Sequence, residues 1–502
     1  MYCFFYFPQN SIQRGAKVEA KTNAELEEIM KSKFHNSTDL KVRNIISYKN
    51  KPTILFFIDN IVDIKRIDRN VIENLQREVL SLQGEETYAE NASKNIITIG
   101  QNQIVTDLEE VEAMLLNGFC AIYFENSTDI LLVDVKNFQS RSIAEPPTSA
   151  VLKGPREGFN ESIATNIMLL RKRLKHNDFV VNQFAVGKYS QTQVAVVYID
   201  SIADSSVVQK VLDKIKNIDI DGIVDAFYLQ KALEERAYSL FQQVGSSEKP
   251  DVVMAKLLEG RVAIIADGSP IVLTVPYILI EDLQSSNDYY SARSTRVTFL
   301  RFLRLLGMLI AIYLPGIYVA LQVFHYKVIP LKFLVTITNS TLGIPFTPLI
   351  EILFIILLFE GLTEASLRMP SYLGLALSVV GALILGDTAV SAGLVSPPAV
   401  MIVALTGVLL FTVPDQEAQI SVLRLIFTII GGVLGLYGMI AGTVFLFAYL
   451  SNIDSYGAPY LAPYAPNVKS DKKDGFRRQD LRGMRERPKS IPNKNPTRLK
   501  KL

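Results

Sequence analysis

Residues 305–324 read LLGMLIAIYLPGIYVALQVF, a stretch without a single charged side chain. A helix needs roughly 20 predominantly apolar residues to cross the hydrocarbon layer of a bilayer. Charged residues are frequent before about residue 290 of the 502-residue chain and nearly vanish between residues 305 and 450. The sequence therefore predicts a soluble α/β N-terminal region followed by an all-α polytopic membrane domain.

The membrane domain is predicted to span residues 286–462 with four to six helical segments. Five hydrophobic stretches qualify, at about residues 302–324, 349–366, 371–393, 397–413 and 422–450. The second stretch is interpreted as broken or re-entrant, because Pro345 and Pro348 precede it and three glutamates interrupt it. Alternatively, residues 331–345 contribute a sixth segment.

Basic residues flank the membrane domain on both sides. Arg296, Arg301 and Arg304 precede the first hydrophobic segment, and residues 463–502 form a basic tail that is predicted to be disordered. By the positive-inside rule, the soluble region and the tail both lie in the cytoplasm. This orientation requires an even number of crossings.

The soluble region contains a weak internal repeat. TILFFIDNIVD at 53–63 resembles QVAVVYIDSIAD at 193–204, which matches Asp59 with Asp200. A second pair of strands matches Gly118 with Gly260. The repeat predicts two similar α/β subdomains, at residues 1–140 and 161–285, although β-rich segments also resemble one another by chance.

Residues 141–160, between the two copies, are rich in Pro, Ser and Gly and read as a linker. We expect the inter-subdomain hinge at its end, formed by Gly154, Pro155, Arg156, Glu157, Gly158 and Phe159. The helix that follows ends in four cations, which are interpreted as a solvated helix end matched to the helix dipole. These cations are Arg171, Lys172, Arg173 and Lys175.

Signatures of enzymes and of nucleic-acid binding are not found in the sequence. The histidines His35, His176 and His325 are far apart, and neither cysteine accompanies them at metal-ligand spacing. The GPREG run lacks the Lys-Ser/Thr of a phosphate-binding loop. The chain contains no Trp, and its aromatic residues do not alternate with basic ones. We therefore expect neither catalysis, nor a cofactor or metal site, nor nucleic-acid binding.

Ionisable residues inside the membrane half are the candidate functional residues. Glu360, Glu364 and Arg368 are spaced four apart, so they share one face of a helix, and Glu364 can pair with Arg368. Glu351 lies on the same segment. This face either turns to a conduction path or subunit interface, or it is an ordinary helix end at the membrane surface.

Asp387 is a lone carboxylate in the stretch VVGALILGDTAVSAGLVSPP, residues 379–398. It either caps a half-helix within the membrane, pairs with an arginine, or lies on an ion or solute path. The residue types leave these alternatives open.

Ordered blocks from about Asp39 to Pro463 carry a family resemblance. They include LKGPREGFNESIATNIMLLRKRL (152–174), LLEGRVAIIADGSPIVLTVP (257–276), GIPFTPLIEILFIILLFEGLTEASLRMP (343–370), GALILGDTAVSAGLVSP (381–397) and SYGAPYLAP (455–463). In these blocks the chain resembles the A subunits of nutrient germinant receptors, the GerA-type spore germination proteins.

The resemblance implies a non-enzymatic receptor subunit of the spore inner membrane. It implies partners too, namely a permease-like B subunit that binds the nutrient and a lipoprotein C subunit. Several A subunits would oligomerise into a nutrient-gated ion channel, with Asp387, Glu360 and Glu364 at the pore or at subunit interfaces. A solute transporter and a non-conducting scaffold are the alternative hypotheses.

Overall fold

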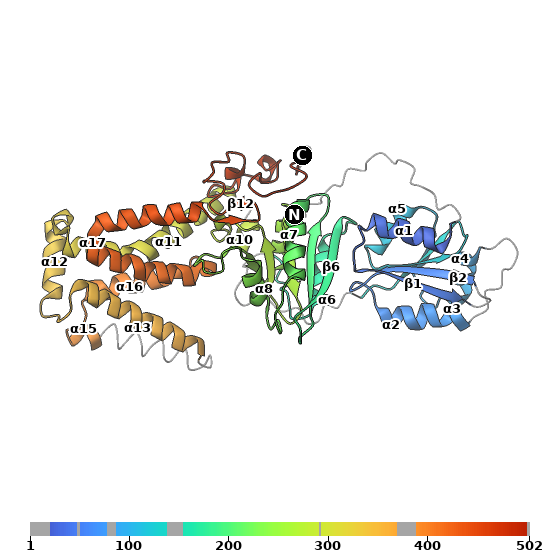
Figure 1. Cartoon of the computed structure of the whole chain (residues 1–502), viewed down its shortest axis with the longest axis horizontal. Helices are drawn as coiled ribbons and strands as arrows, with labels where there is room; N and C mark the ends of the chain where they lie inside the picture. Colours follow the sequence, from blue (N-terminus) through green and yellow to red (C-terminus); the bar gives the residue numbers. More distant parts are fainter. Residues whose placement is uncertain are drawn as a thin grey trace. The chain divides into compact units, whose positions relative to one another are not determined.

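The computed structural model describes residues 21–47, 51–77, 87–137, 154–290, 293–368 and 388–498. The chain forms two compact units. The first comprises Met1–Ala237, Val244–Pro276 and Arg487–Arg498, and the second comprises Tyr238–Gln243, Tyr277–Glu486 and Leu499–Leu502. Unit 1 is α/β and unit 2 is helical, which confirms the predicted fold class (Figure 1).

The first subdomain is an antiparallel five-stranded sheet with short helices. Its strand order is β1-β2-β4-β5-β3. The strands are β1 (Leu40–Ser47), β2 (Lys51–Ile58), β3 (Asn102–Val105), β4 (Phe119–Phe124) and β5 (Ile130–Asp134). The α-helices are α1 (Asn23–Lys33), α2 (Ile64–Ile67), α3 (Glu73–Arg77), α4 (Tyr88–Asn91) and α5 (Leu108–Leu115), with π-helical turns at Asp68–Ile72 and Ala92–Ile96.

The second subdomain repeats this architecture. Its strand order, β6-β7-β9-β10-β8, is the first order shifted by five strands, and its pairs are also antiparallel. The strands are β6 (Phe179–Val186), β7 (Thr192–Ile199), β8 (Gly245–Ser247), β9 (Val262–Ala266) and β10 (Val272–Val275). The helices are α6 (Ile163–Arg173), α7 (Ser205–Lys216), α8 (Ala226–Leu233) and α9 (Pro250–Leu257).

Residues matched by the sequence repeat occupy equivalent places in the two copies. The amides of Asp59 and Asp200 each donate a 2.8 Å hydrogen bond to the carbonyl that precedes the copy's first strand. Gly118 lies one residue before β4 and Gly260 lies two residues before β9, and their φ values are 87° and 106°. A side chain at such a φ is strained, so the turn favours Gly in both copies. The internal repeat is therefore a structural duplication.

A buried ion pair joins the two copies within unit 1. Arg171, on α6 of the second copy, donates from Nε to Asp39 Oδ2 at 2.8 Å and from Nη2 to Asp39 Oδ1 at 3.0 Å. Both side chains are only 1% exposed, and Ser37 donates to the same carboxylate at 2.5 Å. The interpretation of Arg171 as part of a solvated helix end is therefore wrong. The fork of the guanidinium fits the carboxylate, and this pairing offsets the desolvation of both charges.

Unit 2 contains α10 (Ser286–Tyr289), α11 (Ser294–Val323), α12 (Leu331–Thr341), α13 (Pro348–Arg368), α15 (Ala389–Ser391), α16 (Pro397–Leu410) and α17 (Glu417–Ser451). Short 3-10 turns lie at Leu279–Glu281, Tyr326–Val328 and Pro414–Gln416. Among the residues that the structure describes, two helical stretches qualify as membrane spans by length and composition, Ser294–Val323 and Pro414–Ser451. Pro397–Leu410 is a shorter apolar helix.

Helix α13 corrects the interpretation of the second hydrophobic segment as broken. It runs as one α-helix of 21 residues from Pro348 to Arg368. Pro348 is the first helical residue, where the missing N–H would have no intrahelical acceptor. Pro348 therefore marks the start of the helix and does not interrupt it.

Helix α17 folds back on itself at Gly435. This glycine has φ 65° and ψ −158°, which lies outside the helical region. A Cβ placed on Gly442 would lie 3.3 Å from side-chain atoms of Ile430 and Phe427. In a straight helix, residues 12 apart are about 18 Å apart along the axis. The last predicted segment, 422–450, is therefore two helical halves that pack side by side (Figure 1).

Small residues let α11 and the first half of α17 approach closely. A Cβ on Gly316 would lie 2.9 Å from the carbonyl carbon of Phe427, and one on Gly431 would lie 2.9 Å from the carbonyl carbon of Gly316. The atoms that such a Cβ would meet belong to the backbone of the facing helix, and backbone cannot move aside as a side chain can. The glycines thus set the separation of the two helices.

Replacing Gly431 by Ala should destabilise the helix bundle by about 1–3 kcal/mol, because the two helices must separate to admit the methyl group. Thermal unfolding of the purified chain in detergent measures the effect. Gly407→Ala on α16 is the matched control, since a Cβ there meets nothing within 4 Å. Equal unfolding midpoints for the two variants would contradict the close approach of α11 and α17.

The C-terminal segment differs from the predicted disordered tail. After the hairpin of β11 (Asp454–Ser455) and β12 (Ala458–Pro459), residues 463–498 run through 3-10 turns at Asp471–Lys473 and Leu481–Gly483. Ile491 is 1% exposed, and Arg487 is 8% exposed. Composition suggested disorder because basic residues dominate the tail, but a few apolar and hydrogen-bonding residues within it are buried.

Candidate functional site

An ion pair within the helix bundle joins α13 to α17. Arg424 Nη2 donates to Glu360 Oε1 at 2.6 Å, and Ser421 also donates to this carboxylate oxygen. The Arg424 side chain is 2% exposed, whereas that of Glu360 is 40% exposed. The pair therefore has one buried member and one member that reaches the surface of the bundle.

The surroundings of Arg424 are polar on one side. Its Nη1 lies 3.5 Å from Thr406 Oγ1 on α16, while its Nε has no hydrogen-bond partner among the described residues. Sequence reasoning did not identify this arginine. The signal was available, because Arg424 is the only Asp, Glu, Lys or Arg between residues 418 and 451. A lone charge in an apolar helix indicates a partner on another helix.

The predicted pair of Glu364 and Arg368 is present near the end of α13. Arg368 donates to Glu364 Oε1 from Nε at 2.9 Å and from Nη2 at 2.5 Å. Both side chains are exposed, at 60% and 81%. Their role at a pore or an interface stays a prediction, and the structure separates them from Glu360, which pairs with another helix.

Glu351 occupies a different environment, at the other end of α13. Its side chain is 1% exposed, and its Oε1 accepts a 2.5 Å hydrogen bond from the amide of Ser396. Ser396 is the N-cap of α16 and accepts from Ala399 N through its hydroxyl. The positive end of the helix dipole thus faces the Glu351 carboxylate, which stabilises a buried negative charge.

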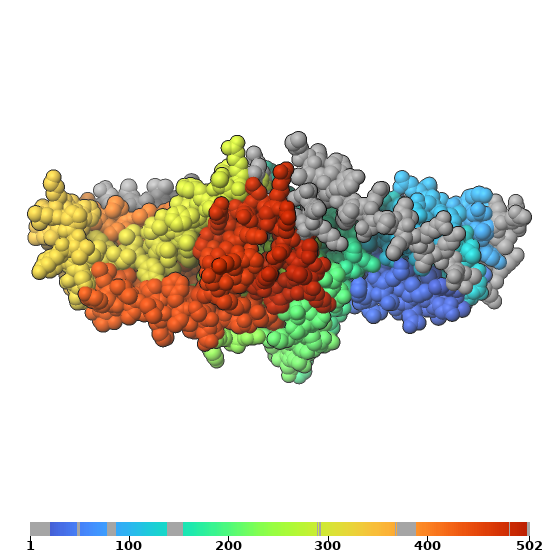
Figure 2. Space-filling model, turned by 90° about the horizontal axis from the view of Figure 1, so that it is seen from above, coloured from blue at the N-terminus to red at the C-terminus, as the bar shows by residue number. Residues whose placement is uncertain are grey.

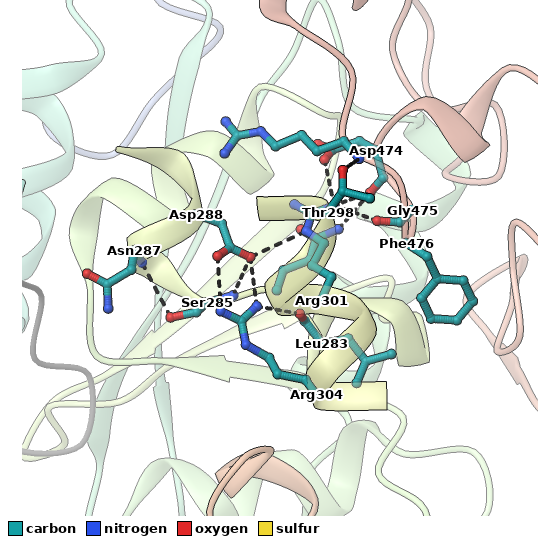
Figure 3. A network of polar contacts seen from close by, with 12 residues as sticks. Leu283, Ser285, Asn287, Asp288, Thr298, Arg301, Arg304, Asp474, Gly475 and Phe476 are labelled. Carbon is teal, nitrogen blue, oxygen red and sulfur yellow. Dashed lines mark hydrogen bonds and ion pairs between the residues drawn. The ribbon is translucent and has the colours of Figure 1, made fainter. Parts of the chain in front are cut away.

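A second ionised network lies where the chain enters α11 (Figure 3). Asp288 on α10 accepts from Arg304 at 2.8 and 3.0 Å and from Arg301 Nε at 3.3 Å. Arg301 Nη1 also donates to Asp474 Oδ1 at 2.9 Å and to the carbonyl of Gly475 at 2.6 Å. Burial raises the pKa of Asp288, but its hydrogen bonds and charge pairing with Arg304 and Arg301 outweigh this and hold the pKa below its usual value.

This network ties the C-terminal segment to the start of the first membrane helix. The sequence marked Arg301 and Arg304 as orientation signals, and their carboxylate partners, Asp288 and Asp474, were not identified. The residues that follow α17 therefore return to the end of α11 at which the membrane half begins.

A buried carboxylate, Asp282, lies beside this network. Tyr277 donates to its Oδ2, as does Gln416 Nε2 at 2.5 Å, and Gln242 donates to the Tyr277 hydroxyl at 3.2 Å. Burial raises the pKa of Asp282 to about 7, and the nearby Asp415 adds to this effect. The same burial raises the pKa of Tyr277 well above its usual value. Asp282 thus titrates near neutrality in the folded protein.

The stability of unit 2 should depend on pH through Asp282. The folded carboxyl keeps its proton up to about pH 7, whereas in the unfolded chain it ionises near its ordinary pKa of about 4. Between these values the folded state binds more protons, so stability falls as pH rises. Asp282→Asn should remove this part of the slope in unfolding midpoints measured from pH 4 to 8. Asp454→Asn, an exposed control, should keep it, and an unchanged slope in Asp282→Asn would contradict the assignment.

The predicted hinge is attached to the second subdomain. Lys249 Nζ donates to the carbonyl of Pro155 at 3.1 Å, and Glu157 pairs with Lys172 and Arg173. Phe159 is 7% exposed and its amide donates to Glu248 O at 2.8 Å. Gly154 has a positive φ of 126°, and Arg156 and Gly158 lie between these points. Hinge motion at these residues stays a prediction.

Asp387, the other candidate of the membrane half, lies outside the described residues.

Residues 28–490 match the family described as Bacillus/Clostridium GerA spore germination protein. Spore germination protein KA of Bacillus subtilis (strain 168) is 34% identical over 472 residues, which cover 93% of this chain and 86% of the relative. Spore germination protein GerLA of Bacillus cereus is 30% identical over 489 residues, which cover 96% and 98%.

A solved structure is also similar, the crystal structure of the N-terminal domain of the A subunit of the Bacillus megaterium spore germinant receptor GerK3. It aligns with a TM-score of 0.42 and 26% sequence identity, over 53% of this chain and 98% of that one. The family match covers most of the chain, and the two relatives align with both its soluble and its membrane half. The chain therefore belongs to the Bacillus/Clostridium GerA spore germination protein family.

Proposed function

We propose that this chain is the A subunit of a nutrient germinant receptor and that several copies form a nutrient-gated ion channel whose opening starts germination. The family resemblance supports the receptor role, with a permease-like B subunit and a lipoprotein C subunit as partners in the spore inner membrane. The chain acts without catalysis in this proposal. Its membrane half of some 150 residues is small for a stand-alone transporter.

The exposure of charged side chains on α13 is the observation that favours a channel. Glu360, Glu364 and Arg368 are 40%, 60% and 81% exposed on a single chain. A charge that faces hydrocarbon costs several kcal/mol, so exposed charges on membrane helices turn to water or to a neighbouring protein. A pore between copies of the chain supplies both surroundings.

The helix order supports a topology with both flanks in the cytoplasm. Gly316 packs against Gly431, so the first half of α17 lies along α11. The chain reverses at Gly435, and the second half of α17 runs back in the opposite direction. Asp474, beyond α17, binds Arg301 at the start of α11. The soluble region and the C-terminal segment then lie on one side of the membrane, as the arginines in the first turns of α11 indicate.

Cysteine accessibility along α13 tests the pore. Single cysteines replace residues 356–368 in a chain whose native Cys3 and Cys120 are changed to Ser, and a membrane-impermeant thiol reagent is applied to vesicles that hold the receptor. We expect positions 360, 364 and 368 to react, and Leu362, which lies on the opposite side of the helix from Glu360 and Glu364, to stay unreacted. If positions 360 and 364 both stay unlabelled, the proposal of a water-lined face is contradicted.

The alternative functions predict different results. A transporter would accumulate a tracer solute in vesicles that hold this chain without partners. A scaffold would show neither tracer uptake nor ion conductance, although it would still co-purify with the other subunits.

A further inference from the structure

In the first α/β copy, residues just after its fourth sheet strand, β5, cover the turn that holds Gly118. Val62 forms an antiparallel bridge with Lys136, and Asn137 N donates to Ile61 O at 3.0 Å. A Cβ on Gly118 would lie 2.8 Å from Lys136 Cγ. The copy therefore completes this surface with its own chain, a few residues beyond β5.

In the second copy the equivalent strand, β10, ends at Val275, and the chain continues into unit 2 at Tyr277. The equivalent place is filled instead by the C-terminal segment. Ala203, the counterpart of Val62, bridges to Asn493, and Lys494 N donates to Ile202 O at 2.8 Å. A Cβ on Gly260 would lie 2.9 Å from Asn493 Cβ. These contacts match those of the first copy, but they are made by a segment that lies more than two hundred residues after β10 in the sequence.

Further contacts hold this segment. The Arg487 guanidinium donates to Leu258 O at 2.7 Å, beyond the C-terminus of α9, and to the carbonyls of Asn495 and Thr497 at 2.9 and 2.5 Å. A helix C-terminus presents carbonyls without intrahelical donors, which a guanidinium satisfies. Lys494 Nζ donates to Asp200 O at 2.9 Å. Figure 2 shows the red C-terminal residues against green residues of the second copy.

We propose that the second α/β copy carries a peptide-acceptor groove, formed by Ile202, Ala203, Leu258 and Gly260, whose ligand is the chain's own segment 487–498. We call this segment the strap. The ligand is a short extended peptide. Its Asn packs against Gly260, and its Arg donates a hydrogen bond to the Leu258 carbonyl after α9. Without the strap, the turn at Gly260 would be uncovered. In the first copy the residues after β5 cover the equivalent turn, whereas in the second copy the chain after β10 continues into unit 2.

The groove gives the basic tail a defined role. The chain leaves the second copy at Pro276, passes through unit 2, and returns to the same copy at Arg487. The membrane half is thus linked to this subdomain at both of its ends. This inference rests on contacts within unit 1 and does not depend on the channel function.

Disulfide trapping in the full chain tests where the strap binds. Ala203→Cys and Asn493→Cys are combined with Cys3→Ser, while Cys120 stays, because it is fully buried and burial raises the pKa of its thiol. Mild oxidation should link the two cysteines within one chain, which gives a faster-migrating monomer on a non-reducing gel. Asn493→Cys with Ile46→Cys, an exposed residue of β1, is the control pair and should stay unlinked.

A linked dimer would assign the groove to the strap of a neighbouring copy, and linkage no greater than in the control pair would show that the strap is not docked. Either outcome overturns the proposal. Loss of ion conductance is not a readout here, so failure of the channel function leaves this test unaffected.

A second measurement needs no cysteine. Trypsin should cut wild-type protein slowly after Lys494, and Arg487→Ala should speed this cleavage on the order of 10-fold by releasing the strap. Arg485→Ala is the matched control, since Arg485 is exposed two residues earlier, and should leave the rate unchanged. Rapid cleavage after Lys494 in the wild-type protein, or equal rates in the two variants, would refute docking.

Discussion

Glu360→Gln is expected to destabilise the helix bundle by about 3 kcal/mol and to disturb gated ion flux. The substitution removes the negative charge that faces Arg424 Nη2 at 2.6 Å and leaves a 2% exposed guanidinium without its counter-charge. Removing the counter-charge of a buried charge costs more than removing both charges, because the remaining charge stays desolvated. Thermal unfolding of the purified chain in detergent measures the stability part.

Two variants make this prediction specific. Glu364→Gln is the matched control one turn later, where both charges are exposed, and it should cost less than about 1 kcal/mol. The double variant Glu360→Gln, Arg424→Gln removes both charges and should be more stable than Glu360→Gln alone. If Glu360→Gln unfolds at the same temperature as Glu364→Gln, the Glu360 carboxylate does not stabilise the buried charge of Arg424.

Asp39→Asn is expected to be the most destabilising single polar substitution in unit 1, at about 3–5 kcal/mol. It leaves Arg171 with no carboxylate at a site where both side chains are 1% exposed. The duplication supplies the control. Asp178 precedes β6 as Asp39 precedes β1, but its side chain is 20% exposed and contacts His35 at 3.3 Å.

Asp178→Asn should therefore cost about 0–1 kcal/mol. The measurement is the unfolding midpoint of the soluble region within the full chain, where 4 kcal/mol corresponds to a shift of roughly 8–16 °C. Similar midpoints for the two variants would mean that the ion pair between the subdomains contributes little to stability.

The sequence predicted the fold class and the duplication because both depend on local patterns. Short runs of β-branched and aromatic residues indicate the strands. Gly118 and Gly260 recur because each turn requires a positive φ. The pairing of Glu364 with Arg368 was predictable for the same reason, since residues four apart on a helix are always neighbours.

Features that depend on distant parts of the chain were not predictable. Nothing near Arg171 indicates that it meets Asp39, which lies 132 residues earlier. Likewise, Arg424 meets Glu360 across 64 residues. The fold-back at Gly435 was hidden among other glycines, because only one of them takes a non-helical conformation within α17.

The tail is the clearest case. Its composition is that of disordered segments, and its order comes from a groove on the second copy that its own residues do not specify. Asn493 stands out only once Gly260 and Ala203 are known to lie beside it.

Single-channel recording from the purified chain in planar bilayers tests the central claim most directly. The account predicts discrete conductance steps, ion selectivity that changes in Glu360→Gln, and wild-type selectivity in a variant that lacks the strap. Absence of conductance from the chain, both by itself and together with its B and C subunits, would contradict the claim that it forms the channel.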